Sequence, residues 1–337
     1  MIFTKETHKI AFEDGYIIKG CAIQNADRQM YLLVEDNDEK RKDGYLPEYR
    51  FLYTYAHIED HNENYFSTGR THLCQPKIEY SKLDEDIIGL DIGGQLYSEG
   101  LDGDREEEDL STSLKDQGSN YSAIYQNIKT VGDSMYAIGR PHRLFKRLGV
   151  NDWQNLSSSI PLAPHYLDGT FASSGIESGW RDIDGFSEQD MYLAGGDGEV
   201  WHYDGKEFIQ CDFPSNELLA NVCCADDGFV YIGGRRGRLW KGKGDKWQLI
   251  SDRQFTIPWT DIVWFDDRLF LGGDYGLWEF KDGEVIEAEV PDQVLTCSGA
   301  LSICPEKKYL LTAGNNGASM YDGKEWTVLF DRFDLPD

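Results

Sequence analysis

The second half of this chain is built from one repeated unit. The motif YDGKEF at 203–208 returns as YDGKEW at 321–326, and looser copies begin at Lys243 and Lys281. A second block precedes each copy, with the sequences YLAGGDGEVW from Tyr192, YIGGRRGRLW from Tyr231, LFLGGDYGLW from Leu269 and LLTAGNNGASM from Leu310. Self-similarity at a period of about 40 residues, in a chain rich in short β segments, predicts a β-propeller.

Each unit contains four apolar runs separated by polar turns. The best copy reads WRDIDGF from Trp180, MYLAGG from Met191, EVWHY from Glu199 and EFIQCDF from Glu207. Apolar and polar positions alternate within the runs, which indicates strands, and the D-G turns favour tight hairpins because they tolerate positive φ. Four short antiparallel strands per unit make one propeller blade.

The first half follows the same scheme less closely. TVGDSMYAIGRPHRLFKRL from Thr130, with NDWQNL from Asn151, aligns as a further blade, and 157–179 is then a long insertion before the next one. We therefore expect one all-β domain over 1–337, with clear blades within 120–330 and divergent blades within 1–119. Seven four-stranded antiparallel blades are the preferred count, and six is the alternative.

The balance of charge narrows the class of partner. The chain has 33 Lys and Arg residues against 60 Asp and Glu residues, a formal net charge of −27. Acidity on this scale repels nucleic-acid phosphates and anionic membrane surfaces, so neither is an expected partner. It favours a basic protein, through electrostatically steered association. The alternative is that the charge serves solubility alone.

Several features indicate a soluble, cytoplasmic protein. No continuous apolar run approaches the length of about 18 residues that a membrane span needs, and the N-terminal sequence MIFTKETHKI lacks the apolar region of a secretion signal. The seven cysteines are an odd number without framework spacing, so a reduced compartment is the simpler interpretation. We expect a monomer when the protein is free of its partner.

Some residue groups suggest chemistry, but none has the spacing that the chemistry requires. The run DGDREEED at 102–109 reads as a solvated loop, and both it and the acidic segment 34–40 depart from the ligand order of a calcium loop. His57 and His61 follow a strand pattern, and the Cys223–Cys224 pair has no second pair for a zinc site. The chain also lacks a nucleophile elbow and a P-loop. We therefore expect no catalytic residue, no metal and no cofactor.

The positions that change between repeats suggest a binding surface. In a blade, the turn between the second and third strands emerges on the same propeller face as the connections between blades. The repeats keep their frame but vary at this turn, at Arg140, Asp197, Arg235, Arg236, Asp274, Tyr275, Asn315 and Asn316. Trp180, Arg181 and Trp259, at the starts of blades, are candidate anchors on the same side. The alternative for Trp180 and Trp259 is packing at the start of an inner strand.

Across 120–330 the pattern resembles bacterial WD40-like propellers and the propeller repeats of photosystem assembly factors, although the WD dipeptide of true WD40 units is not in register. The chain is also similar to propeller-type immunity proteins of bacterial polymorphic, Rhs-type toxin systems. That resemblance implies a non-enzymatic protein that neutralises a cognate basic toxin by covering its active site. The alternative is a glycan-active propeller, a lectin or a glycoside-cleaving enzyme, with carboxylates near the channel mouth at Asp182, Asp197, Asp261 and Asp274.

Overall fold

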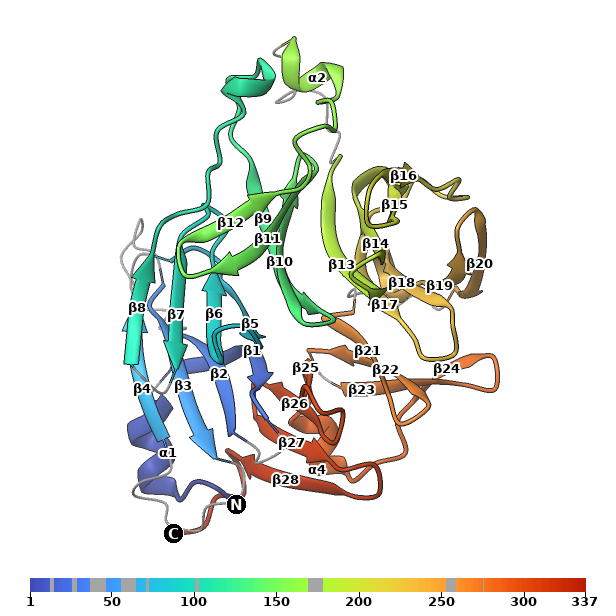
Figure 1. Ribbon diagram of the computed structural model, residues 1–337. Helices are drawn as coiled ribbons and strands as arrows, with labels where there is room; N and C mark the ends of the chain where they lie inside the picture. Colours follow the sequence, from blue (N-terminus) through green and yellow to red (C-terminus); the bar gives the residue numbers. More distant parts are fainter. Residues whose placement is uncertain are drawn as a thin grey trace. The chain divides into compact units, whose positions relative to one another are not determined.

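The computed structural model describes residues 1–12, 15–25, 29–36, 47–55, 65–70, 73–100, 103–168, 178–252, 259–274 and 276–337. Within these ranges the strands form seven four-stranded antiparallel sheets, each made of four consecutive strands (Figure 1). The fold is a seven-bladed β-propeller, which confirms the preferred blade count, and the alternative of six was wrong. The helices in the described part of the chain are all too short and too polar to traverse a lipid bilayer.

The chain divides into two compact units, which we describe separately. The four-sheet unit is Gln75–Trp259, and the three-sheet unit combines Met1–Cys74 with Thr260–Asp337. A single domain over the whole chain stays a prediction.

The four-sheet unit holds β5 (Lys77–Ser81), β6 (Asp86–Leu90), β7 (Leu96–Gly100), β8 (Gly103–Glu107), β9 (Ile124–Val131), β10 (Ser134–Arg140), β11 (Arg143–Gly149), β12 (Asp152–Asn155), β13 (Trp180–Ser187), β14 (Asp190–Gly195), β15 (Val200–Tyr203), β16 (Phe208–Gln210), β17 (Leu219–Cys224), β18 (Val230–Gly234), β19 (Leu239–Lys243) and β20 (Lys246–Ser251). It also holds the helix α2 (Pro164–Leu167) and the 3-10 turns η1 (Lys115–Gln117), η2 (Gly196–Gly198) and η3 (Arg235–Gly237).

The three-sheet unit holds β1 (Tyr16–Ile23), β2 (Gln29–Asp36), β3 (Tyr49–Tyr55), β4 (Tyr65–Arg70), β21 (Asp261–Phe265), β22 (Arg268–Gly273), β23 (Gly276–Lys281), β24 (Glu284–Glu287), β25 (Ala300–Ile303), β26 (Leu310–Gly314), β27 (Gly317–Tyr321) and β28 (Trp326–Asp331), with helices α1 (Lys5–Phe12) and α4 (Asp292–Thr296).

The repeated YDGKE motif forms the hairpin between the third and fourth strands of a sheet. The Asp204 carboxylate accepts hydrogen bonds from the backbone N–H groups of Lys206 and Glu207, both at 2.8 Å, and Gly205 adopts a φ of 91°. Asp322 makes the equivalent pair of bonds in the last sheet. An aspartate that bonds to the backbone ahead of it, followed by a glycine at positive φ, stabilises a tight turn. The motif therefore recurs because the turn requires it.

The hydrophobic core lies between neighbouring sheets. Tyr192 and Ala194 on β14 pack in one cluster with Val222 on β17 and Ile232 on β18, and each is at most 2% exposed. Side chains alternate along a strand, so each sheet presents one apolar face to the sheet before it and one to the sheet after it. Burying side chains of this size contributes about 1.5–3 kcal/mol each.

In the three-sheet unit, the first and last sheets of the chain pack directly against each other, with β1 against β25 and β26. The N-terminal segment seals this contact, because the Ile2 N–H donates to the Leu329 carbonyl at 2.7 Å and the Phe3 ring meets Phe330 edge-on at 5.1 Å. Lys5 forms an ion pair with Asp337. Phe3 also lies in one apolar cluster with Leu32 of β2 and Phe330 of β28, so the N-terminal segment packs against both the first and the last sheet.

A small lobe projects from the four-sheet unit (Figure 1). It consists of 108–123, between β8 and β9, and of 156–168, the described part of the insertion predicted before β13. Leu114, Leu162 and Tyr166 form its own apolar cluster, and the Ser119 hydroxyl donates to the Tyr166 carbonyl at 2.6 Å. Both segments connect one sheet to the next, so the lobe stands on the face that carries such connections.

Candidate functional site

The turns between second and third strands in the four-sheet unit carry the candidate binding residues. Because four consecutive strands alternate in direction, these turns lie on the same face as the connections between sheets. We call this side of the four-sheet unit the turn face. Its turns η2 and η3 have the same backbone, with φ of 56° at Asp197 and 60° at Arg236. Both residues are exposed, so equivalent positions present opposite charges.

Each turn is anchored to a neighbouring connection by backbone hydrogen bonds. The Gly196 N–H donates to the Gly179 carbonyl at 3.1 Å, and the Arg235 N–H donates to the Leu218 carbonyl at 3.1 Å. A Cβ atom at Gly198 would lie 1.8 Å from the Ser215 carbonyl oxygen, so the turn and the connection touch through backbone atoms. The turns are thus held in fixed positions before any partner arrives.

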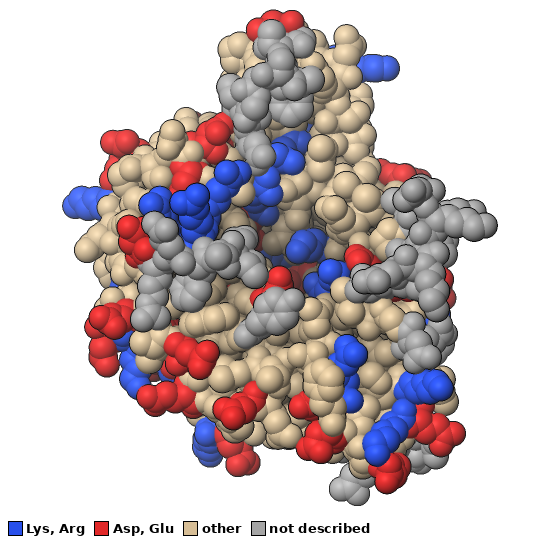
Figure 2. Space-filling view, turned by 180° about the vertical axis from the view of Figure 1, so that it is seen from behind, with Lys and Arg blue, Asp and Glu red and all other residues tan. Residues whose placement is uncertain are grey.

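Arginine side chains dominate the η3 turn. Arg238 pairs with Asp252 at 2.8 Å and approaches Glu217 at 3.7 Å, whose carboxylate also accepts the indole N–H of Trp240. Arg235 and Arg236 are exposed, and neither has an ion-pair partner among the described residues. Figure 2 shows Lys and Arg side chains gathered at the foot of the lobe, although the chain as a whole is strongly acidic.

Arg140 and Arg181 are half-buried. Arg140 ends β10 and lies against the connection before β13, because a Cβ at Gly179 would be 2.9 Å from the Arg140 Cα. Beside it, the His142 imidazole is 2.6 Å from the Glu199 carboxylate, which also accepts the Gly179 N–H at 3.1 Å. These contacts fasten the β10–β11 turn to the next sheet.

The structure buries both candidate tryptophan anchors. Trp180 is 0% exposed and stacks on Phe208 with ring centroids 5.4 Å apart, and Trp259 is 4% exposed. Both therefore occupy the packing position that was the alternative to a binding anchor. Neither side chain offers a surface that a partner could cover.

The remaining candidates belong to the three-sheet unit. Asp274, after β22, is exposed. Asn315 and Asn316 lie between β26 and β27 and are half-buried, and the Asn316 amide donates to the Thr296 carbonyl at 3.0 Å. Tyr275 lies outside the described residues. A binding role for these residues stays a prediction.

Asp182 is a structural residue. Its carboxylate accepts the Val222 N–H of β17 at 2.7 Å and the Asn127 amide of β9 at 2.8 Å, and it lies 3.3 Å from the Lys129 ammonium group. The side chain is buried, at 3% exposure. One carboxylate thus joins three inner strands, and its hydrogen-bonding capacity is used within the protein.

Asp261 repeats this arrangement in the three-sheet unit, where it accepts the Leu301 N–H at 3.0 Å, again 40 residues further along the chain. Both aspartates follow a tryptophan by two positions, in WRD and WTD. This W-x-D spacing is the signal that could have predicted strand-linking carboxylates instead of glycan-cleaving ones. Asp182 and Asp261 therefore do not support the glycan-active alternative.

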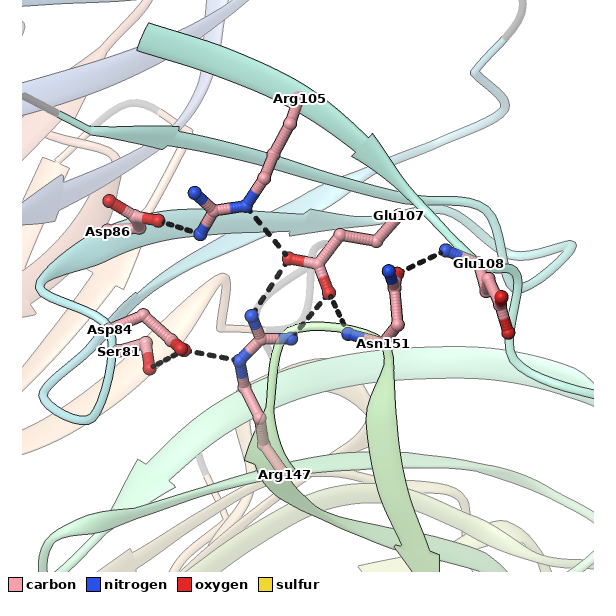
Figure 3. Close-up of polar contacts among 8 residues, drawn as sticks. All are labelled: Ser81, Asp84, Asp86, Arg105, Glu107, Glu108, Arg147 and Asn151. Atoms are coloured by element: carbon pink, nitrogen blue, oxygen red, sulfur yellow. Dashed lines mark hydrogen bonds and ion pairs between the residues drawn. The ribbon is translucent and has the colours of Figure 1, made fainter. Parts of the chain in front are cut away.

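The acidic run 102–109 was wrongly interpreted as a solvated loop. Residues 103–107 form β8, which lies at the edge of its sheet. Figure 3 shows Arg105 and Glu107 of this strand among their partners. Glu107 accepts two hydrogen bonds, each 2.8 Å, from the guanidinium of Arg147, a residue of the next sheet. Asp84 binds the same guanidinium. Arg105 on the same strand binds Asp86. The alternation of charges along β8 therefore reflects cross-links between strands and sheets.

Electrostatics make the Glu107–Arg147 pair strong. Burial alone raises the pKa of Glu107, but the hydrogen bonds and charge of Arg147 outweigh it and hold that pKa below its ordinary value. Asn151 completes the network, since its N–H donates to Glu107 at 3.2 Å. Both carboxylate oxygens of Glu107 are thus engaged by groups of the protein, as Figure 3 shows, which gives the network a structural role.

No group of three or more His, Cys, Asp or Glu side chains that could hold a metal ion is found in the described ranges. His57 and His61 lie outside these ranges, as does most of the acidic segment 34–40. Cys223 is buried, and burial raises the pKa of Cys224 well above its ordinary value, which disfavours a thiolate.

The comparisons with known proteins agree with this arrangement. No family model matches the chain. The crystal structure of RRP9 WD40 repeats superimposes with a TM-score of 0.57 and 8% sequence identity, over 90% of this chain and 91% of that one, so the chain has the fold of a WD40-like β-propeller. The immune protein Tsi7 of Pseudomonas aeruginosa is 27% identical over 245 residues, which are 72% of this chain and 75% of Tsi7.

Together these findings confirm the resemblance to propeller immunity proteins. The similarity to an immune protein supports an immunity role in general. It is also consistent with a non-enzymatic function.

Proposed function

We propose that this protein is a non-enzymatic immunity protein that binds a cognate toxin and neutralises it by covering the toxin's active site. The observation that carries the proposal is the similarity to an immune protein over 245 residues. A β-propeller suits this role, because its rigid sheets present exposed turns whose sequence can vary without changing the fold. The turn face of the four-sheet unit is the surface we assign to binding.

The proposed toxin is basic overall. A net charge of −27 attracts a cationic protein over long distances and raises the rate at which the two meet. Fast association matters for an immunity protein, since it must capture the toxin before the toxin acts. Exposed carboxylates on the turns, such as Asp197 and Asp274, would pair with cations on the toxin.

We further propose that the protein is a cytoplasmic monomer when free.

The carboxylates Asp182 and Asp261, two of the candidates for a glycan-cleaving mechanism, are engaged in bonds between strands. The proposal therefore assigns no catalytic step to this chain.

The test uses the product of the gene next to the one that encodes this protein. The two genes are expressed together in a sensitive host, and each is also expressed alone. The proposal predicts that the neighbouring product alone stops growth, that co-expression restores it, and that the purified pair elutes as one stoichiometric complex. Growth arrest that co-expression leaves unchanged, with no complex on size-exclusion chromatography, would reject it.

A second measurement examines the mechanism. The toxin's activity is measured in vitro with increasing amounts of this protein. Covering of the active site predicts full inhibition at one equivalent and competition with substrate. If this protein bound the toxin without inhibiting it, the toxin would still be its partner, but the proposed covering of the active site would be wrong.

A further inference from the structure

We infer that the η3 turn, through Arg235 and Arg236, docks a carboxylate-bearing patch on the toxin surface and sets the orientation of the complex. This inference rests on the proposed function and names the chemistry that one part of the turn face recognises.

The first observation is that the turn does not need arginine. The equivalent turn η2 has the same backbone with Asp197 where η3 has Arg236, both at φ near 60°. Positive φ favours Gly, Asn and Asp, and it disfavours a long side chain such as that of arginine. The fold therefore does not require a particular side chain at this position, and the charge of the side chain is available for recognition.

The second observation is that these two cations are left unpaired. Several other cations in the described part of the unit pair with carboxylates, as in Arg147 with Glu107, Lys146 with Glu188 and Lys241 with Asp227. Arg235 and Arg236 have no such partner there, although the chain carries 60 acidic residues. Two adjacent exposed arginines on a turn fixed by its backbone thus form a preorganised anion-binding surface.

The third step decides which anion this surface takes. A guanidinium forms two parallel hydrogen bonds with a carboxylate or a phosphate. A nucleic acid would bring many phosphates toward a protein of charge −27, and the net repulsion opposes that approach. A local cluster of carboxylates on a basic protein meets no such barrier, so a protein patch is the better match.

A basic toxin with an acidic docking patch is consistent both with the negative net charge of this protein and with the positive charge of its η3 turn. Exposed charges are screened beyond about 8 Å at physiological salt, so the net charge acts during approach and the arginines act at contact. Contact charges set the register of a complex and disfavour wrong orientations. The arginine turn therefore provides specificity, and the overall acidity provides speed.

The experiment compares two variants with the same change in net charge. The test variant is Arg235→Glu with Arg236→Glu. The control is Lys206→Glu with Lys246→Glu, because both lysines are exposed and lie at the opposite ends of the strands from the turn face. Lys206 is in the turn between β15 and β16, and Lys246 is the first residue of β20. Circular dichroism and thermal melting establish that both variants are folded. Affinity for the toxin is then measured by calorimetry at low and physiological salt.

We expect the arginine variant to bind the toxin at least about tenfold more weakly than the control, mainly through faster dissociation. Replacing the toxin's carboxylates by lysine, one at a time, should identify a variant that restores binding to the arginine variant. Equal affinity in the arginine and control variants overturns the inference and leaves the proposed function standing. A wild-type protein that does not bind the toxin overturns both.

A single-stranded oligonucleotide of ten thymidines serves as the probe for the competing chemistry. The inference predicts no binding of this probe to the wild-type protein at physiological salt. Binding that depends on Arg235 and Arg236 would assign the surface to phosphate and overturn the carboxylate assignment.

Discussion

Glu107 on β8 and Arg147 on β11 form a doubly hydrogen-bonded ion pair in which both side chains are fully buried. The two strands belong to successive sheets, so the pair joins one sheet to the next, as does the bond between Arg147 and Asp84. A buried pair with this geometry is costly to break from one side, because the remaining partner loses much of the charge that compensates its own.

Glu107→Gln should lower the free energy of unfolding by about 1–3 kcal/mol, since Arg147 keeps Asp84 as a counter-ion but loses the charge of Glu107. Urea denaturation followed by tryptophan fluorescence would measure it. Glu108→Gln is the matched control, because the Glu108 side chain is exposed and should change stability by no more than about 0.5 kcal/mol. Equal effects of the two substitutions would mean that the buried pair contributes nothing specific.

His8 should make the protein sensitive to mild acid. Burial, and then the nearby charge of Arg332, lower the pKa of His8 to about 4 from its ordinary value of 6.5, and the ring stacks on Phe12 at 4.5 Å. The folded state thus holds the imidazole neutral, while the unfolded chain takes up a proton below pH 6.5. Stability from this residue is complete above about pH 6.5 and falls as the pH drops toward 4.

His8→Phe should remove this part of the pH dependence and leave stability at pH 7.5 nearly unchanged. The measurement is the unfolding free energy of both proteins at several values between pH 7.5 and 4.5. Parallel curves for the two proteins would show that another group is responsible.

Asp182→Asn should destabilise the protein by about 1–3 kcal/mol, because an amide group cannot accept all the hydrogen bonds that the carboxylate receives from two neighbouring strands. Asp197→Asn is the control: it sits in an exposed turn at positive φ that asparagine tolerates, so stability should change by less than about 0.5 kcal/mol. Thermal melts of both variants distinguish them. If Asp182→Asn left the thermal stability unchanged, the role of Asp182 as a link between strands would be refuted.

Substitutions at two glycines can distinguish the cost of backbone strain from the cost of a steric clash. Gly198 and Gly228 both have positive φ, at 71° and 83°. A Cβ at Gly228 would meet nothing within 4 Å, whereas at Gly198 it would lie 1.8 Å from the Ser215 carbonyl oxygen. Gly228→Ala should cost about 1–2 kcal/mol from strain alone, and Gly198→Ala should cost about 1–3 kcal/mol more. Similar losses in chemical denaturation would contradict close packing of η2.

The blades were predictable because their signals are local. The YDGKE motif carries its own turn, through Asp204 and Gly205, and the strands on either side alternate in polarity. A period of about 40 residues then implies repetition of one sheet, and the count of seven is confirmed. The insertion before β13 was predictable for the same reason, since it interrupts the period.

The acidic run 102–109 could not be interpreted locally. DGDREEED has the composition of a solvated loop, but Glu107 and Arg105 find partners on other strands, and one of those partners is 40 residues further along the chain. Pairing between distant residues neutralises the charge that makes the run look like a loop. Composition describes the charges and says nothing of their partners.

The same distinction between local signals and distant contacts applies to the candidate binding residues. The sequence by itself determined which positions fall in turns, because turn chemistry and strand periodicity are properties of neighbouring residues. Only the tertiary structure decided that Trp180 and Trp259 are buried, that Asp182 links strands, and that Arg235 and Arg236 stay exposed and unpaired among the described residues. Burial and pairing depend on what packs against a side chain, and those contacts join residues that are far apart in the chain.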